Sequence, residues 1–239
     1  MQKYIQQILV PEIGIEGQNL ISQAKVLVIG AGGLGTPLCA YLAAMGIGTL
    51  AIADGDIVSE SNLHRQFLYC YDDLGKKKVD VLKKTLIVTN PGILIKTYDL
   101  MVAEDLGIEF IFKEYDIICD CTDNIEARLL IDKLCSETNK VQVYGAVRDW
   151  QGYVTILNGK NKIRLTDIFS YDKLQSESQN NCSVSGIVSS VCGIIGSFMA
   201  TETIKIITNQ QTGLDGSILC INALYNSNKV FKIKKIQIK

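Results

Sequence analysis

A glycine-rich turn between an apolar run and a helical pattern constrains the fold of this chain more than any other feature. The turn reads Gly-Ala-Gly-Gly-Leu-Gly over residues 30–35 and directly follows the β-branched run 26–29. Glycines let the backbone turn tightly and approach a phosphate group, which then lies at the positive end of the following helix. Asp54 ends the next expected strand, where a carboxylate accepts hydrogen bonds from ribose hydroxyls. We therefore predict a nucleotide site formed by Asp54 and the glycines of the turn, which are Gly30, Gly32, Gly33 and Gly35.

Apolar and amphipathic runs alternate over the first 150 residues. We expect strands at 26–29, 49–53, 93–98, 115–119 and 141–147, and helices at 34–45, 76–89, 103–112 and 125–139. Such an alternation is typical of a mostly parallel sheet with helices on both faces. The sequence therefore predicts a Rossmann-like α/β fold.

The pattern changes after Trp150. We expect a strand at 153–157, a long polar crossover loop at 158–184, a helix at 186–208, and strands at 217–222 and 230–238. Long loops of this kind are usually functional. We predict one domain over residues 1–239 with an antiparallel C-terminal extension. Its nucleotide-binding half covers residues 20–150, and its carrier-binding and crossover half covers residues 151–239.

The bulk composition excludes several classes of function. The formal net charge is −1, with 24 basic and 25 acidic residues, so the chain has no electrostatic footprint for nucleic acid. The longest apolar stretch, 186–200, is shorter than the roughly 20 residues that span a bilayer, and Glu202 and Lys205 follow it. We therefore expect a buried core helix there and no membrane association. No basic-then-apolar segment opens the chain, so no signal peptide is expected.

Cysteine and histidine usage bears on metals and on the cellular compartment. The chain has eight cysteines at irregular spacing, no Cys-x-x-Cys pair, and a single histidine, His64. These residues provide no visible zinc ligand set and no Ser-His-Asp triad. Reduced thiols fit the spacing better than a disulfide framework. We expect no zinc and a cytoplasmic location, with an organelle stroma as the alternative.

Polar residues follow several of the expected strands, at the sheet edge where open α/β folds bind ligands. Arg65 and Lys78 provide the cations that a triphosphate needs, and Asp123 provides a carboxylate for Mg²⁺. Each has a simpler interpretation. The two cations are as easily explained as solvated surface charges, and Asp123 as the N-cap of the helix at 125. The glycine turn itself also occurs in NAD-dependent dehydrogenases, so it does not specify the nucleotide.

Several motifs together resemble the ThiF/MoeB/HesA family, whose fold is similar to the catalytic core of ubiquitin-activating enzymes. The resemblance covers the chain from Tyr4 to Phe231, and its most specific parts are Ser-Asn-Leu-x-Arg-Gln at 61–66 and Cys-Thr-Asp-Asn at 121–124. Gly17-Gln18, the glycine turn, Asp54 and Asp56, Lys78, Asn181-Cys182 and Gly186 also match. The run 33–37 and Asn181-Cys182 are closest to the ThiF branch.

The resemblance implies an ATP- and Mg²⁺-dependent adenylyltransferase. Its substrate would be the C-terminal Gly-Gly tail of a ubiquitin-like sulfur carrier protein such as ThiS or MoaD, in thiamine or molybdopterin biosynthesis or for another product. By matching position, Asp54 would bind the ribose, Asp123 would bind Mg²⁺, and Cys182 would take part in sulfur transfer. The phosphates would be held by Asn62, Arg65 and Lys78, with Gln66 in the same pocket.

The chain also departs from the family. It lacks both Cys-x-x-Cys pairs that bind zinc in relatives, and Gln6 stands where relatives carry an arginine that reaches into the neighbouring subunit of a homodimer. No rhodanese-like extension is seen, so sulfur would come from a separate donor protein. Two rival functions remain open: a catalytically degenerate scaffold that binds a ubiquitin-like partner, and an NAD-dependent oxidoreductase.

Overall fold

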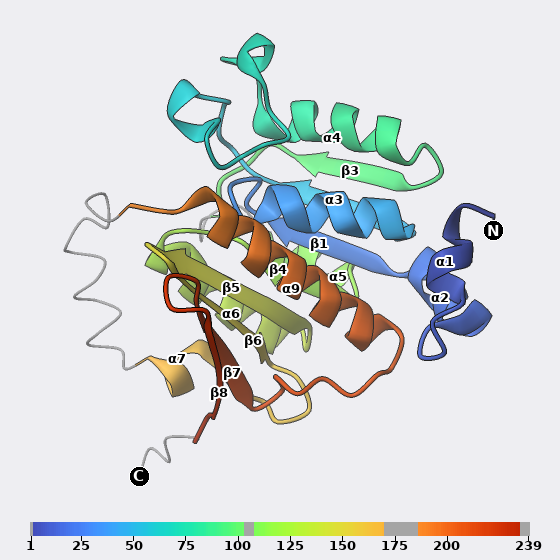
Figure 1. Ribbon diagram of the computed structural model, residues 1–239, viewed down its shortest axis with the longest axis vertical. Coiled ribbons are helices and arrows are strands. Elements are labelled where there is room, and N and C mark those ends of the chain that lie inside the picture. The colour runs from blue at the N-terminus through green and yellow to red at the C-terminus, as the bar shows by residue number, and fades with distance from the viewer. Residues whose placement is uncertain (1, 103–107, 170–185, 235–239) are drawn as a thin grey trace.

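One eight-stranded sheet runs through the molecule (Figure 1). The computed structural model describes residues 2–102, 108–169 and 186–234. The strand order is β3-β2-β1-β4-β5-β6-β7-β8. The parallel strands are β1 (Lys25–Ile29), β2 (Thr49–Ala53), β3 (Leu94–Tyr98), β4 (Ile117–Asp120) and β5 (Val141–Arg148). Antiparallel pairing then continues through β6 (Gln151–Leu157), β7 (Ser217–Asn222) and β8 (Ser227–Lys232).

Helices cover both faces of the sheet. The longer ones are α2 (Gly14–Gln23), α3 (Gly35–Met45), α4 (Lys78–Thr89), α6 (Ile125–Glu137) and α9 (Ser189–Ile207). The shorter ones are α1 (Ile5–Ile8), α5 (Glu109–Lys113) and α7 (Leu165–Ile168). Figure 1 shows α3 and α9 in front of the sheet and α6 behind it. The mostly parallel sheet with an antiparallel extension agrees with the predicted fold class.

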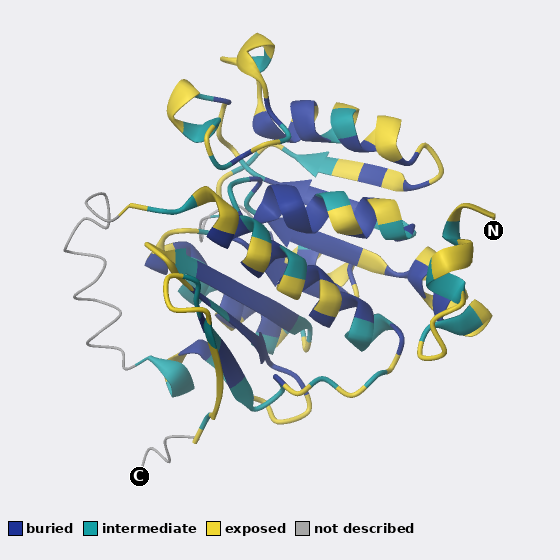
Figure 2. Ribbon diagram, viewed as in Figure 1, coloured by how far each residue is buried: buried dark blue, intermediate teal, exposed yellow. Residues whose placement is uncertain are grey.

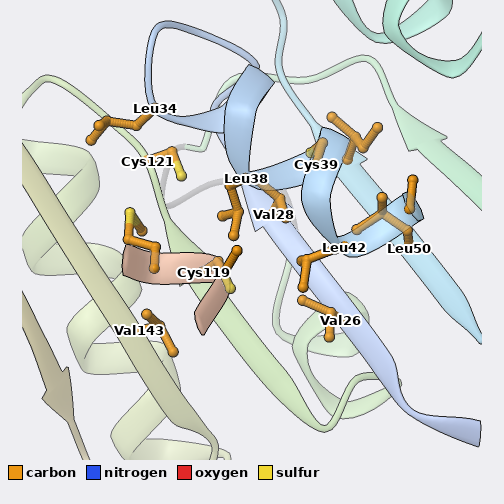
Figure 3. Close-up of a cluster of buried hydrophobic side chains, with 14 of the residues drawn as sticks. Val26, Val28, Leu34, Leu38, Cys39, Leu42, Leu50, Cys119, Cys121 and Val143 are labelled. Carbon is orange, nitrogen blue, oxygen red and sulfur yellow. The ribbon is translucent and has the colours of Figure 1, made fainter. Parts of the chain in front are cut away.

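The alternation of side chains along β1 explains why both faces are covered. Val26 and Val28 point into one core with α3 and α9, whereas Leu27 and Ile29 point into a second core with α5 and α6. Figure 3 shows Val26 and Val28 facing the side chains of α3. All four side chains are almost fully buried, as Figure 2 shows for the central strands. A strand that is apolar at every position requires such two-sided packing.

The strand order reverses at β1 and β4. The chain leaves β1 toward β2 on one side and later leaves β4 toward β5 on the other. In open α/β sheets, ligands bind in the crevice at the carboxyl ends of the strands where this reversal occurs. The turn 30–35 after β1 and the turn 121–124 after β4 therefore meet at the predicted binding edge.

Helix α9 is the one helix among residues 2–102, 108–169 and 186–234 that is long and apolar enough to cross a membrane, with a mean hydropathy of 1.4. Half of that window is nevertheless buried inside the fold. A Cβ atom at Gly152 or Gly145 would lie 2.2 Å from Ile195 or Met199 of α9, so β5 and β6 carry glycines where the helix presses on them. The helix belongs to the core, as its sequence predicted.

The structure differs from the sequence-based expectations at several element ends. Helix α7 lies inside the stretch 158–184 that we expected to be a loop, and residues 170–184 lie outside the described residues. Strand β8 begins at Ser227 rather than at 230, because Asn222 to Ser227 form a tight turn that pairs the strand with β7. Helix α5 begins at Glu109 rather than at 103, and residues 103–107 also lie outside the described part.

The N-terminal helices were not predicted. Helix α2 carries Gly17 and Gln18 of the family pattern, and the Gln18 and Gln7 side-chain amides both donate to the carbonyl of Met45 at 3.2 Å. They satisfy a carbonyl at the end of α3 that has no partner within the helix. We predicted no helix over residues 5–23, although α2 is amphipathic: it buries Gly17, Gln18 and Ile21 and exposes most of its other residues.

Candidate nucleotide-binding site

The glycine turn has a backbone that only glycine allows at two positions. Gly30 adopts φ +95°, and a Cβ atom at Gly35 would lie 1.9 Å from the carbonyl oxygen of Gly30. Side chains hold two carbonyls of the turn: Thr36 Oγ1 donates to Gly32 O at 3.0 Å, and Tyr69 donates to Ala31 O at 2.8 Å. The fold therefore requires Gly30 and Gly35 irrespective of any ligand.

Gly32 is different, because packing does not explain it. A Cβ atom there would meet only Gln66 Nε2, at an ordinary contact distance of 3.6 Å. Gln66 is only 3% exposed, and its Oε1 atom has no hydrogen-bond partner among the described residues. A buried polar atom without a partner is costly. The open side of Gly32 and the unpartnered amide of Gln66 thus fit a bound polar ligand at the turn.

Asp54 holds the turn from the carboxyl end of β2. Its Oδ2 accepts a hydrogen bond from Ala31 N at 2.7 Å, and its Oδ1 accepts from Asp56 N at 2.8 Å. Each carboxylate oxygen keeps a further lone pair, so a ribose hydroxyl at this place would still find an acceptor. The predicted ribose role of Asp54 therefore fits its geometry.

Lys78 is a buried cation at the N-terminus of α4. It is only 4% exposed, and its Nζ donates to Asp56 Oδ2 at 2.7 Å. A cation at the positive end of a helix is unfavourable without anionic compensation. Asp56 is mostly exposed, so it neutralises this charge only partly. A phosphate group would complete the compensation. The burial of Lys78 rules out its interpretation as a solvated surface charge.

Arg65 lies over the glycine turn. Its Cδ atom is 3.6 Å from the position of a Cβ at Gly33. Nη1 donates to Ser61 O at 3.0 Å and lies 2.8 Å from His64 Nε2. Its Nε and Nη2 groups make no hydrogen bond to the described residues, so they remain free for an anion. Asn62 contributes its backbone here, because its carbonyl accepts from Arg65 N and Gln66 N at 3.1 and 3.0 Å.

Asp123 is exposed and makes no side-chain hydrogen bond within the described part of the chain. The N-cap of α6 is instead Asn124, whose Oδ1 accepts from Ala127 N at 2.8 Å. The alternative interpretation of Asp123 as the cap is therefore wrong. The turn that carries it packs against the glycine turn, since a Cβ at Gly30 would lie 2.7 Å from Cys121 O.

The sequence missed Cys192, which lies in the first turns of α9 and shapes the site. Its Sγ would be 2.9 Å from a Cβ at Gly33, so this contact explains why Gly33 is glycine. Burial raises the pKa of the Cys192 thiol, and the Arg65 guanidinium opposes that rise. Cys192 lies far along the chain from the glycine turn, so no local sequence pattern connects the two. Cys182 lies outside the described residues. Within the described part of the chain, no three His, Cys, Asp or Glu side chains cluster so that they could hold a metal ion.

The glycine turn, Asp54 and the cationic groups at the reversal of strand order define a Rossmann-like nucleotide-binding protein. A comparison with family models then matches residues 4–238 to the ThiF family. The chain belongs to the ThiF family.

Known proteins of this fold share the whole length of the chain. A probable molybdopterin-synthase adenylyltransferase of Porphyra purpurea is 38% identical over 231 residues, covering 97% of this chain and 60% of the relative. The chain thus spans about three-fifths of such relatives. The crystal structure of E. coli MccB with succinimide has a TM-score of 0.87 at 19% identity, covering 99% of this chain and 73% of the other. The crystal structure of E. coli MccB with ATP has a TM-score of 0.80 at 20% identity. The match covers 93% of this chain and 67% of the MccB chain.

Proposed function

We propose that this protein transfers the adenylyl group of ATP to the C-terminal carboxylate of a ubiquitin-like sulfur carrier. Membership of the ThiF family and the name of the Porphyra relative, a probable molybdopterin-synthase adenylyltransferase, support this activity. The same name favours a MoaD-like carrier with a Gly-Gly tail, whereas the run 33–37 favours a ThiS-like carrier. Sulfur would then come from a separate donor protein.

The observation that carries the proposal is the excess of positive groups around a glycine turn that has room for phosphate. Arg65 lies beside Gly33, and helix α3 begins in the turn. Buried Lys78, at the N-terminus of α4, pairs with Asp56, whose backbone N donates to the same Asp54 carboxylate that accepts from Ala31 N in the turn. A triphosphate needs such compensation, whereas the backbone cradle usually suffices for a dinucleotide pyrophosphate. The site therefore suits ATP better than NAD.

The reaction needs positioning more than covalent help from the protein. An oxygen of the carrier carboxylate attacks the α-phosphorus, the bond from that phosphorus to the bridging oxygen breaks, and pyrophosphate leaves with the electron pair. Arg65 and Lys78 would offset the charge that develops on the phosphate oxygens. Mg²⁺ bound with ATP would add further positive charge on these oxygens. Asp123 would hold that ion, because its exposed carboxylate has no partner among the described residues.

ATP–pyrophosphate exchange tests this function. We expect exchange that depends on a MoaD- or ThiS-like carrier and falls by about 100-fold or more in Asp123→Asn, because Mg²⁺ loses its charged ligand. The exposed Asp72→Asn on the turn Tyr71–Asp73 is the matched control and should exchange like the parent. Calorimetry should show ATP binding and no NAD binding. Parent-like exchange by Asp123→Asn with every carrier would disprove the site assignment.

We also propose that two copies of the chain associate through an apolar groove beside the site. The groove has a volume of about 510 Å³ and is lined by Pro37, Tyr41, Phe67, Gly193, Ile194, Ser197, Phe198 and Thr201. Part of the groove runs along α9, and Figure 2 shows that the surface of this helix that faces away from the sheet is partly exposed. Helix α3 begins in the glycine turn, and Cys192 of α9 packs against Gly33 of the same turn. A second copy in the groove would therefore adjoin the nucleotide site, as the family resemblance implies for a homodimer.

Light scattering distinguishes this dimer from a monomer. The variant Phe198→Asp should shift the chain from dimer to monomer, since it puts a charge into the groove. Phe110→Asp on α5 is the control, because Phe110 is more exposed but lies on the other face of the sheet. A monomeric parent, or loss of the dimer in both variants, would contradict the groove as the interface.

The role of Cys182 in sulfur transfer is a separate proposal that rests on the family resemblance. Cys182→Ser should leave pyrophosphate exchange unchanged, because adenylylation uses only the phosphate site. It should lower the yield of carrier thiocarboxylate in an assay with a sulfur donor. Equal thiocarboxylate yields from variant and parent would remove Cys182 from the mechanism without affecting the adenylylation step.

A further inference from the structure

Asp120 is a fully buried carboxylate at the end of β4 that the proposed reaction does not use. Its Oδ1 accepts two hydrogen bonds from Thr122, one from the backbone N at 3.0 Å and one from Oγ1 at 2.7 Å. Its Oδ2 accepts from Gln142 Nε2 at 3.1 Å. Asp120 therefore holds Thr122, the residue that immediately precedes Asp123.

Arg128 holds Thr122 too, through the Thr122 carbonyl rather than the Thr122 backbone N. Its Nε and Nη2 donate to Thr122 O at 3.2 and 2.8 Å, and its guanidinium stacks 5.4 Å from the ring centre of Tyr144. On the far side of Asp123, Asn124 is fixed as the N-cap of α6. Both neighbours of Asp123 are thus tied to the fold, while its own carboxylate has no partner among the described residues.

This arrangement is expensive for the fold. Burial raises the pKa of the Asp120 carboxyl, and the charge of Arg128 and the hydrogen bonds from Thr122 oppose the rise. Gln142 Oε1 is also buried without a partner in the described part of the chain. A well-packed apolar pair in place of a buried charge and a half-satisfied amide is often neutral or stabilising. Stability alone therefore does not account for Asp120 and Gln142.

We propose that Asp120 and Arg128 are positioning residues that fix the turn 122–124, so that Asp123 presents its carboxylate to the Mg²⁺ that accompanies ATP. This inference rests on the proposed function, because it takes Asp123 as the Mg²⁺ ligand. Partners that orient a ligating carboxylate typically contribute about 10- to 100-fold to metal affinity. Neither residue needs to touch the metal or the nucleotide for this effect.

The test measures metal affinity directly, with Mn²⁺ as the probe. Electron paramagnetic resonance reports free Mn²⁺ in the presence of saturating ATP, and calorimetry reports ATP binding without metal. Asp120→Ala should weaken Mn²⁺ binding about tenfold and leave metal-free ATP binding unchanged. Asp120→Asn should restore most of the affinity, since its side-chain oxygen can still accept both bonds from Thr122.

Two further variants separate positioning from a loss of stability. Asp132→Ala is the matched control, because Asp132 is also buried and accepts from Arg164 Nε at 2.9 Å and Leu165 N at 3.2 Å, away from Asp123. It should lower the free energy of unfolding without changing Mn²⁺ affinity. Arg128→Met removes the donor to Thr122 O and keeps the bonds from Thr122 to Asp120, so it loosens the turn from its other side, and it should weaken Mn²⁺ binding as Asp120→Ala does.

Asp123→Asn serves as the reference for interpretation. If it weakens Mn²⁺ binding while Asp120→Ala and Arg128→Met do not, the positioning role is overturned and the proposed function stands. Equal weakening by Asp132→Ala would also overturn the positioning role, because the effect would then follow stability. If Asp123→Asn itself leaves Mn²⁺ affinity unchanged, the assignment of Asp123 as ligand fails, and the positioning role fails with it.

Discussion

The parallel half of the sheet and its antiparallel half bury their residues very differently. Strands β1, β2 and β4 are buried on both faces, whereas β8, one of the two outer strands, has no fully buried residue. The candidate nucleotide site is built mainly on the turns that follow the buried strands β1, β2 and β4. A rigid, doubly covered scaffold holds several distant side chains in register, while an exposed edge leaves backbone groups unpaired for a partner. The candidate site thus lies where the sheet is covered on both faces, and the outer strand β8 takes no part in it.

The largest effect should come from a methyl group in the glycine turn of the parallel half. Gly35→Ala places a Cβ 1.9 Å from Gly30 O, and we expect it to lower the free energy of unfolding by about 3 kcal/mol or more. Gly32→Ala has ordinary contacts and should stay within about 0.5 kcal/mol of the parent. It should nevertheless weaken ATP binding about tenfold, because the methyl group occupies the open side of the turn.

Urea unfolding and ATP titration of both variants check this prediction. If Gly32→Ala loses stability but not ATP affinity, packing explains Gly32 after all. The open side of Gly32 would then not be the place where the nucleotide binds.

The same substitution in the two halves should differ in its effect on stability. Val28 of β1 is fully buried, whereas Val230 of β8 is 58% exposed. Val28→Ala should lower the free energy of unfolding by about 2 kcal/mol, which is the lost burial plus a small cavity. Val230→Ala should stay within about 0.5 kcal/mol. Equal losses in a denaturant titration would show that another chain or segment covers β8 in solution.

Thiol reactivity should follow the same division. Burial raises the pKa of Cys39, Cys119, Cys121 and Cys135, all in the parallel half or its helices, so these groups stay protonated thiols at pH 8. Burial also raises the pKa of Cys220 in β7, but that side chain is only partly covered. Among the described cysteines, exposed Cys70 should react first with Ellman's reagent, Cys220 more slowly, and these four buried thiols only after unfolding. Fast reaction of a buried thiol in the native protein would indicate local opening of the parallel half.

The smallest effect should be that of a metal chelator on the antiparallel half. The segment after β6 is held without metal: Asp215 accepts from Lys160 N at 2.8 Å and from Asn161 N at 3.2 Å, and Arg164 pairs with Asp132. We therefore expect much less than one zinc per chain by elemental analysis and the same melting temperature with and without chelator. Stoichiometric zinc, or a chelator-dependent melting temperature, would reveal ligands from distant cysteines.

The sequence predicted the fold better than it predicted the details of the site. The strands 49–53 and 217–222 agree with β2 and β7 at both ends, since their apolar patterns are local. Helices α1 and α7 were missed, because four residues are too few to show a helical period. Helix α2 was missed although its sequence is amphipathic. The sequence offered Asp123 as a cap for the helix at 125, and only the structure showed that its neighbour Asn124 is the cap.

The sequence by itself determined the alternation of strands and helices, the glycine turn and the family. These depend on interactions between residues a few positions apart, which a local pattern records. Tertiary structure decided the rest of the site: that Cys192 makes glycine necessary at 33, that Asp56 pairs with Lys78, and that Asp120 holds the turn of Asp123. Cys192 and Lys78 lie far in sequence from their partners, and Asp120 was unremarkable until its burial was known. The price of burying a charge depends on what surrounds it, and only the folded chain specifies those surroundings.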